Sequence, residues 1–522
     1  MQEGKKSQRA MVENRTLGDT VFPKRHLFLD TDNLVEWDLN VVQRCHKAEK
    51  VPVTGLEPGE PGAWDGRVTV AYGSTLVEDG LFRRWYGCMA LSRGYKEDAD
   101  HWMTAYAESD DGIHWRKPDL KLTGQKRWPG NNLLKLPCCP MTIVRPLPGA
   151  DYKYLGLILQ KAPLEPDVSD TGDIEYNGGG MYLFGSDDGF RWRQITKNPI
   201  IQHGDWAVLH VDRFKQRYLL YQKMGTCHGL TPRRSALVIE SKDGIHWEGY
   251  DGLRQWQETF APDDYDDLIA AQRGCKIGEL YGYATLQVDR LYLVAENFFT
   301  VGLPLHHKQH QNPNGPSHLR MAFSHDGKIW RYPRGRPSFL EVGNEGDFDA
   351  GFLAPSSEIV EHEDNHLLYY SGARYLHGWM ISPDFQMRPD IPLEAQRNSH
   401  QFRGLARIKR DRFAGLASGW KGRFDAEVGP VQGTELTINA YCPHGVVRVA
   451  IAEQIVPLHL SPRKGESLPG FSFDDCVPFT GDSVRAPVRF KNKSLADLPA
   501  DKRLILRFEM CEAEVFGYEW QP

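Results

Sequence analysis

A seven-residue pattern, Ser-x-Asp-Gly-x-x-Trp, occurs four times in this chain of 522 residues and constrains its fold more than any other feature. The four copies begin at Ser109, Ser186, Ser241 and Ser324. An Asp-Gly pair between strand-like runs favours a tight hairpin, because glycine adopts the positive φ that such a turn requires. We therefore interpret the pattern as a structural turn that recurs once per unit of the fold, and not as a catalytic motif.

Pairs of strand-like runs recur five times along the chain. They span residues 67–89, 141–160, 206–223, 268–286 and 352–372. Each of the first four pairs is followed by one copy of the turn pattern, which predicts a second hairpin and hence four strands per unit. In the fifth unit, the expected counterpart is a strand over residues 404–409, a turn at 410–412 and a strand over 413–416.

Five four-stranded units predict an all-β fold built on a five-bladed β-propeller. The uneven spacing of the copies excludes a solenoid of strict period, whereas independent blades tolerate it. The alternative is a six-bladed ring like that of sialidases, but their turn motif has one residue between Asp and Gly, and here the two are adjacent. Leu27–Trp37 is a candidate edge strand for closing the ring. Residues 46–63 are rich in proline and glycine and are expected to form a loop.

The character of the chain changes after residue 417. Strictly alternating stretches such as Thr434–Ala440 and Arg503–Glu509 continue, but the turn pattern does not recur. We expect three parts: a flexible tail over residues 1–20, the five-bladed propeller over 21–417, and a β-sandwich over 418–522.

Charge and hydropathy exclude several classes of partner. The formal net charge is −6 and no long basic run is present, so a nucleic-acid partner is not expected. No apolar stretch is long enough to span a membrane. The N-terminus lacks the apolar segment of a signal peptide, which predicts either a cytoplasmic protein or an exported one whose signal has been removed. Nothing in the sequence indicates the oligomeric state.

Several stretches resemble a known group of proteins. They are the four turn motifs, Leu27–Asp30, Trp64–Gly66, Gly204–Asp205, Gly404–Ala406, Pro469–Cys476 and Gly481–Arg485. Together they resemble bacterial proteins similar to glycoside hydrolase family 32, and the propeller alone also resembles family 43. This resemblance implies a propeller followed by a β-sandwich, and an oligosaccharide or polysaccharide substrate. The usual Trp-Met-Asn-Asp-Pro-Asn-Gly, Arg-Asp-Pro and Glu-Cys motifs of family 32 are absent, so its catalytic residues cannot be transferred by motif.

Glycosidases act with two carboxylates on either side of the bond that is cleaved. In a propeller, residues at the start of each innermost strand face one central funnel, so acids at those positions are the candidates. They are Asp65 in the first unit, Asp205 in the third, Asp266 in the fourth and Asp349 in the fifth. Asp65 is the preferred nucleophile or base, because the first blade supplies that group in the enzymes that the chain resembles.

Sugar sites also need aromatic platforms and groups that bind hydroxyls. The candidates are Trp64, Trp206, Tyr265, Arg273 and His377. His203 and His210 are interpreted as structural, because no second ligand has metal-binding spacing to either. No cofactor is expected from the residues. Resemblance to some family 43 enzymes allows a calcium ion in the central cavity.

The sequence therefore predicts a glycoside hydrolase acting on a fructan-like or furanoside-like glycan. Two alternatives stay open. One is a carbohydrate-binding propeller without catalysis, which the absent family motifs favour. The other is a phosphorylase or transglycosylase that uses the same acids, with Arg145 and Arg273 as candidates for an anion pocket.

Overall fold

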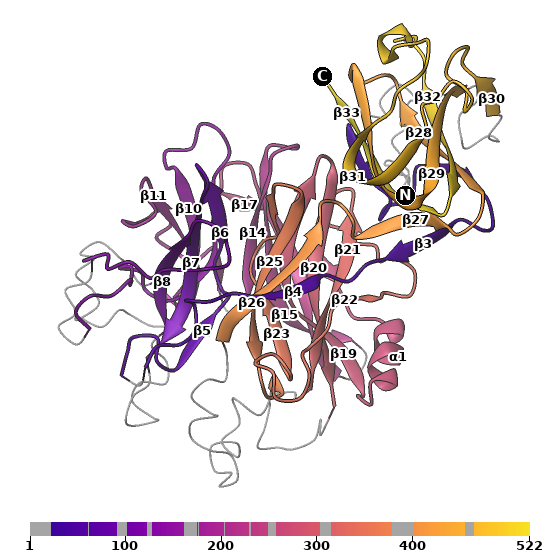
Figure 1. Cartoon of the computed structure of the whole chain (residues 1–522). Helices are drawn as coiled ribbons and strands as arrows, with labels where there is room; N and C mark the ends of the chain where they lie inside the picture. The colour runs from indigo at the N-terminus through magenta and orange to yellow at the C-terminus, as the bar shows by residue number, and fades with distance from the viewer. Residues whose placement is uncertain are drawn as a thin grey trace, which may run out of the picture. The chain divides into compact units, whose positions relative to one another are not determined.

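The computed structural model describes residues 22–60, 62–90, 102–122, 128–160, 175, 177–202, 204–228, 231–248, 257–302, 315–377, 401–454 and 464–522. Two compact units divide the chain. The first is Cys45–Phe413, and the second joins Ala414–Pro522 with the residues that precede Cys45. Both units are built mainly of antiparallel β-strands (Figure 1), and the first also contains one described helix, α1 (Asp264–Gln272). Within the described ranges, no helix has the length and apolar character needed to cross a membrane.

Five sheets follow one another in the first unit. Blade 1 contains β5 (Val68–Val70), β6 (Thr75–Glu78), β7 (Leu81–Met89) and β8 (Met103–Ser109). Blade 2 contains β9 (Pro140–Val144), β10 (Tyr154–Gln160), β11 (Gly180–Ser186), β12 (Arg193–Gln194) and β13 (Ile201–Gln202). Blade 3 contains β14 (Ala207–Asp212), β15 (Arg217–His228), β16 (Thr231–Ser241), β17 (Trp247–Glu248) and β18 (Gln257–Phe260).

The last two blades complete the set. Blade 4 contains β19 (Ile277–Val288), β20 (Leu291–Val301), β21 (Ser317–Ser324) and β22 (Ser338–Leu340). Blade 5 contains β23 (Phe352–Pro355), β24 (Val360–His362), β25 (Asn365–Ala373), β26 (Gln401–Lys409) and β4 (Glu49–Pro52). The predicted five-bladed propeller is therefore confirmed.

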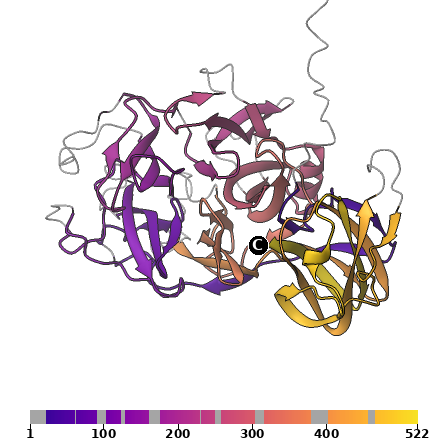
Figure 2. The same cartoon turned by 90° about the horizontal axis from the view of Figure 1, so that it is seen from above.

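The blades surround a common centre (Figure 2). Neighbouring innermost strands contact one another: β9 with β14, β14 with β19, β19 with β23, and β24 with β6. All innermost strands run in the same direction, because every blade has the same antiparallel order. Their N-terminal ends gather at one end of the central channel, which we call the mouth. The hairpins that lead to the second strands gather at the other, which we call the hairpin end.

The four Ser-x-Asp-Gly-x-x-Trp copies follow the third strands of blades 1 to 4, as turns. In the first copy, the Ser109 hydroxyl accepts the Gly112 N–H at 2.9 Å. The Asp111 carboxylate accepts the next two backbone N–H groups, each at 2.8 Å. Gly112 has a φ of 73°, and the Trp115 indole donates to its carbonyl at 3.1 Å. All of these bonds lie within the seven residues of the motif. Each copy therefore forms its own turn and marks one blade.

The strand that closes the ring differs from the expected one. Glu49–Pro52, inside the segment predicted as a loop, forms β4 and pairs with β26 from Arg407↔Glu49 to Gly404↔Pro52. It supplies the outer strand of blade 5 and so links the start of this unit to its end. The predicted fourth strand at residues 413–416 is wrong, because β27 (Ala414–Ser418) pairs instead with β33 (Ala513–Gln521) in the second unit.

A helix replaces the strand predicted over residues 268–272. It is α1 (Asp264–Gln272), capped by Asp263, whose carboxylate accepts the Asp266 N–H at 3.0 Å. The Asp266 carboxylate accepts the Asp263 N–H in return, which completes a capping box. Acidic residues in the first turn stabilise the positive end of the helix dipole. This local chemistry outweighs the short apolar run that suggested a strand.

The second unit is a single ten-stranded sheet. Its strands are β1 (Arg25–Leu27), β2 (Leu34–Trp37), β3 (Val42–Cys45), β27, β28 (Gly422–Gly429), β29 (Glu435–Gln454), β30 (Lys464–Ser467), β31 (Phe479–Pro487), β32 (Leu504–Cys511) and β33, with one 3-10 turn, η2 (Leu495–Asp497). The first half of β29 pairs with β33 and its second half with β32, so one bent strand joins the two halves of the sheet. The two layers expected of a sandwich are thus continuous through β29.

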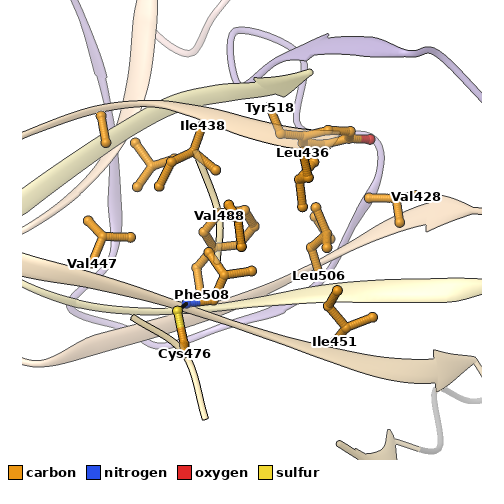
Figure 3. Packing of buried hydrophobic residues seen from close by; sticks show 14 of the residues in the cluster. Val428, Leu436, Ile438, Val447, Ile451, Cys476, Val488, Leu506, Phe508 and Tyr518 are labelled. Atoms are coloured by element: carbon orange, nitrogen blue, oxygen red, sulfur yellow. Dashed lines mark hydrogen bonds between the residues drawn. The ribbon is translucent and has the colours of Figure 1, made fainter. Parts of the chain in front are cut away.

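Residues 25–44 belong to this second sheet, whereas the sequence places them in the propeller. β1 pairs with β33, and β2, from the stretch expected to close the ring, pairs with β28. Phe28 lies fully buried in the core. Figure 3 shows other members of that core, including Ile438, Leu506 and Phe508, with their side chains directed toward one another.

Candidate active site

Aromatic side chains from four blades converge at the mouth of the propeller. Tyr72 follows β5, Trp206 precedes β14, Tyr281 lies in β19, Phe352 begins β23, and His377 follows β25. Ring centroids are 5.0 Å apart for Tyr72 and Trp206, 6.0 Å for Trp206 and Tyr281, and 5.2 Å for Tyr281 and Phe352. The His377 imidazole is 4.9 Å from both Tyr281 and Phe352. We call these five residues the mouth cluster.

A β-bulge places Tyr281 at the middle of this cluster. Leu280 pairs with Phe298 and Gly282 pairs with Asn297, so Tyr281 is the extra residue in β19. Such bulges redirect a side chain out of the regular alternation of the strand. The Tyr281 hydroxyl lies 2.9 Å from Nε2 of His377.

Asp205 joins the cluster through a lysine. Its Oδ1 atom is 2.6 Å from Nζ of Lys223 in β15, and that ammonium lies 3.9 Å from the centroid of the Tyr281 ring. The lysine side chain is 9% exposed and that of Asp205 is 49% exposed. A ligand that reaches the mouth can therefore contact this carboxylate. Burial raises the pKa of the Tyr72 hydroxyl well above its ordinary value, and the charges of Tyr281 and Asp205 add to this effect.

A second ion pair, which the sequence did not reveal, lies beside the same tyrosine. Arg234 in β16 forms a salt bridge with Glu279 in β19. The guanidinium carbon lies 5.2 Å from the Tyr281 ring centroid and 5.5 Å from that of Phe299. Glu279 is only 4% exposed. Tyr281 thus contacts the cationic partners of two carboxylates, Asp205 and Glu279.

Asp65 and Asp349 precede their innermost strands as predicted, but each is buried in an ion pair with a lysine. Asp65 is 1% exposed and lies 2.6 Å from Nζ of Lys117. Asp349 is 2% exposed and lies 2.6 Å from Nζ of Lys50 in β4. It also accepts the Tyr370 hydroxyl at 3.0 Å. The Lys50–Asp349 ion pair links β4, the outer strand of blade 5, to the start of β23 in the same blade.

Trp64 packs against the apolar core that contains Val53, Tyr86 and Phe402. Trp64 therefore has a packing role in this core, which competes with a role as a sugar platform. Trp206 is also buried, at 3% exposure, but it belongs to the mouth cluster.

Asp266 lies on α1, beside Gly278 at the start of β19. Its carboxylate accepts hydrogen bonds from Nη1 of Arg320 at 2.7 Å and from Nη1 of Arg336 at 2.6 Å. Arg320 also donates to Glu296 at 2.5 Å, and burial raises the pKa of that glutamate. The Arg320 guanidinium carbon stacks 4.1 Å from the ring centroid of Phe298. Asp266 therefore belongs to a buried ion network of blade 4.

Tyr265 and Arg273 mark the two ends of the same helix. Tyr265 is 42% exposed, with the Arg336 guanidinium carbon 5.2 Å from its ring centroid. Arg273 is the C-cap and lies 2.8 Å from Oε1 of Glu341. Of the nine predicted site residues, the structure brings Asp205, Trp206 and His377 together at the mouth.

The calcium suggested by family resemblance needs a group of oxygen ligands in the channel. His210 lines the channel, and its Nδ1 atom lies 3.3 Å from the Thr285 hydroxyl. Among the described residues, no three His, Cys, Asp or Glu side chains around His210 have ligand atoms close enough to hold an ion. His203 lies outside the described residues.

No protein-family model matches the chain, and no curated protein sequence matches it. Solved structures are similar at low identity. An N-acetylgalactosamine deacetylase from F. plautii, in complex with blood group B trisaccharide, is 15% identical over 70% of this chain and 96% of that chain, with a TM-score of 0.42. A family 32 β-fructofuranosidase from Bombyx mori is 11% identical over 94% and 96%, with a TM-score of 0.37. A family 43 arabinoxylan arabinofuranohydrolase from Bacillus subtilis is 10% identical over 88% and 96%, with a TM-score of 0.38.

Families 32 and 43, which the sequence motifs resemble, are thus represented among the similar structures. At this level of likeness, the case for a function depends on the residues of the mouth.

Proposed function

We propose that the chain is a glycoside hydrolase whose active site is the mouth of the propeller. The observation that carries this proposal is the position of Asp205: a half-exposed carboxylate fixed by Lys223 beside the mouth cluster. Glu279 is the second carboxylate. The Tyr281 ring contacts Lys223, which pairs with Asp205, and Arg234, which pairs with Glu279. Two carboxylates near aromatic surfaces are the groups that glycosidic cleavage requires.

The two carboxylates differ in ways that suggest separate roles. The ammonium beside Asp205 favours its charged form, which suits attack on a sugar carbon or activation of water. Glu279 is more deeply buried, and we propose it as the proton donor of the pair. Trp206 and Tyr281 are buried and give the mouth cluster its shape, and His377 lies 2.9 Å from the tyrosine hydroxyl. We propose a fructan-like or furanoside-like glycan as the substrate.

The test is a screen of the purified protein against a broad glycan panel, with chromatographic detection of products. On the substrate so identified, Asp205→Asn and Glu279→Gln should each lower kcat by about a hundredfold or more, because each removes one partner of the reaction. Asp187→Asn is the matched control, since Asp187 is an exposed residue of the blade 2 turn. Full turnover in Asp205→Asn would contradict the assignment.

A second candidate function is carbohydrate binding without hydrolysis. The observation that favours it is that each predicted acid has a cationic partner, such as Lys117, Lys223 or Lys50. A carboxylate held in an ion pair is a poor proton donor. Calorimetric binding of an oligosaccharide with no product after long incubation would support this function. Cleavage that requires phosphate would instead reveal a phosphorylase.

A further inference from the structure

A cavity of about 550 Å³ opens at the hairpin end of the channel, and its volume is typical of sites for small organic molecules. Tyr281 of the mouth and Leu286 of the cavity both belong to β19, and they lie about 17 Å apart along the strand. The cavity is therefore distinct from the mouth. All five blades contribute to its wall, which is mostly aliphatic and includes Leu76, Ile143, Leu209, Leu286 and Ile359.

Three hairpins form the rim of this cavity. Arg145 follows β9, Arg213 and Phe214 follow β14, and Asp289 follows β19. Phe214 is 44% exposed, and the guanidinium carbon of Arg290 lies 4.3 Å from its ring centroid. The Asp289 carboxylate lies 4.0 Å from Nε of the same arginine, so this acid of the rim has a cationic partner.

Arg213 brings a positive charge to the rim. It is exposed, and its guanidinium donates to the backbone carbonyls of Arg145 at 2.9 Å and of Pro146 at 3.4 Å. These carbonyl groups orient the guanidinium without neutralising it. In the part of the chain that the structure describes, no carboxylate lies within salt-bridge distance of Arg213. The rim thus holds a charged donor in a fixed position.

Arg145 adds to this positive charge. Its Nη2 atom lies 2.5 Å from the buried Glu78 carboxylate, which also lies 3.6 Å from Nε of Arg83 and 3.5 Å from Nζ of Lys153. Three cations therefore share one carboxylate, which leaves an excess of positive charge beside the cavity. The side chains of Arg145 and Lys153 are about half-exposed, so an anion in solution can approach this charge.

The acid in the wall of the cavity is matched by the protein. Glu358 accepts the Thr75 N–H at 2.5 Å and the Ser357 hydroxyl. Nη1 of the buried Arg84 lies 3.8 Å from the same carboxylate. Burial raises the pKa of Glu358, which further reduces its negative charge. This acid therefore opposes an anion at the rim only weakly.

Other polar side chains of the wall are engaged within the protein. The Thr142 hydroxyl donates to the Ala207 carbonyl at 3.3 Å and accepts the Leu209 N–H at 3.1 Å. The Gln287 amide donates to the Asp212 carboxylate at 3.2 Å. Below its charged rim, the cavity therefore suits an apolar group better than a polar one.

We propose that this cavity is a second ligand site, which takes a small organic carboxylate with an apolar tail. The carboxylate lies at the rim against the Arg213 guanidinium, and the tail lies against the aliphatic wall. A guanidinium binds a carboxylate through charge-assisted hydrogen bonds, which a neutral amide of the same shape cannot match. The proposal does not rest on the glycosidase activity proposed for the mouth.

The first experiment uses the full-length protein and two probes of matched shape, octanoate and octanamide. Calorimetric titration should give one octanoate per chain, and octanamide should bind about tenfold more weakly because it has no charge. Added sodium chloride should weaken the binding of octanoate more than that of octanamide. Equal affinities for the two probes, or no binding of octanoate, would overturn the proposal.

A shorter acid tests the tail. Hexanoate has two methylene groups fewer than octanoate and should bind about tenfold more weakly, because less apolar surface leaves water. Equal affinities for the two acids would mean that only the exposed cations bind them, and the proposed role of the aliphatic wall would be wrong.

Variants then locate the site. Arg213→Gln should reduce the affinity for octanoate to that for octanamide. Arg193→Gln, the same change at an exposed arginine of β12, should leave it unaltered. Asp205→Asn should also bind octanoate normally, because the mouth is a separate site. Loss of octanoate binding in Asp205→Asn, or full octanoate affinity in a folded Arg213→Gln, would refute the assignment.

Discussion

At the scale of single residues, the partner of each acid decides what that acid can do. Asp65, Asp205 and Asp349 occupy equivalent positions in sequence, before the innermost strands of their blades. Asp205 alone among these three has a half-exposed side chain, whereas the other two are almost fully buried. A buried carboxylate that loses its cation carries an uncompensated charge, which is costly. We therefore propose that Asp65 and Asp349 contribute to stability and that Asp205 belongs to the proposed site.

This assignment predicts the effect of removing one lysine. Lys50→Met should lower the free energy of unfolding by about 1–3 kcal/mol, because Asp349 is left with the Tyr370 hydroxyl in place of an ammonium. Urea denaturation measures the change. Lys242→Met, at an exposed position in the blade 3 turn, is the control. An unchanged urea midpoint in Lys50→Met would show that the pair is dispensable.

His210 predicts a dependence of stability on pH. Its pKa is about 4 in the folded chain and about 6.5 when unfolded, because burial disfavours the imidazolium. Since the folded pKa is the lower one, stability is fully present above about pH 6.5 and is lost as pH falls toward 4. The total loss in the free energy of unfolding is about 3 kcal/mol. In urea denaturation, the free energy of unfolding of His210→Leu relative to that of wild type should rise by this amount as the pH falls from 7.5 to 4. A difference that stays constant with pH would contradict burial of the imidazole.

At the scale of single elements, local chemistry was predictable from sequence and long-range pairing was not. The turn motif holds itself together within seven residues, so four blades could be counted from it. The role of β4 depends on pairing with β26, more than 350 residues later, and Glu49–Pro52 carries no local sign of that partner. Tyr281 was missed for a related reason, because a bulge in β19 directs it to the mouth.

The bulge gives a testable consequence at Gly282. A Cβ atom there would lie 2.5 Å from Cε2 of the buried Trp206 ring, so Gly282→Ala should cost about 1–3 kcal/mol of unfolding free energy and lower turnover. Gly225 in β15 is the matched control, since its Cβ would meet nothing within 4 Å. Gly225→Ala should stay within about 0.5 kcal/mol of wild type. Equal thermal shifts in the two variants would argue against close packing of Trp206 on β19.

At the scale of the whole molecule, each unit is completed by strands from distant parts of the chain. The propeller uses β4 from its own start to finish blade 5. The second sheet recruits β1, β2 and β3 from the N-terminal side, with the propeller inserted between them and β27. A boundary drawn from sequence at 417–418 was close to Ala414 because the repeats end there. The N-terminal contribution was not visible, because β1 and β2 are ordinary strands whose partners lie about 490 and about 390 residues away, respectively.

This insertion predicts that residues 414–522 do not fold alone. They lack three of the ten strands, and they also lack Phe28, whose ring packs 5.1 Å from that of Phe424 and 5.9 Å from that of Phe508. Joining residues 22–44 to 414–522 through a flexible Gly/Ser linker should restore a cooperative thermal transition, measured by circular dichroism. Phe28→Ala in the joined chain should cost about 3–5 kcal/mol, because it empties a fully buried position. Cooperative unfolding of 414–522 by itself would show that the three N-terminal strands are accessory to that core.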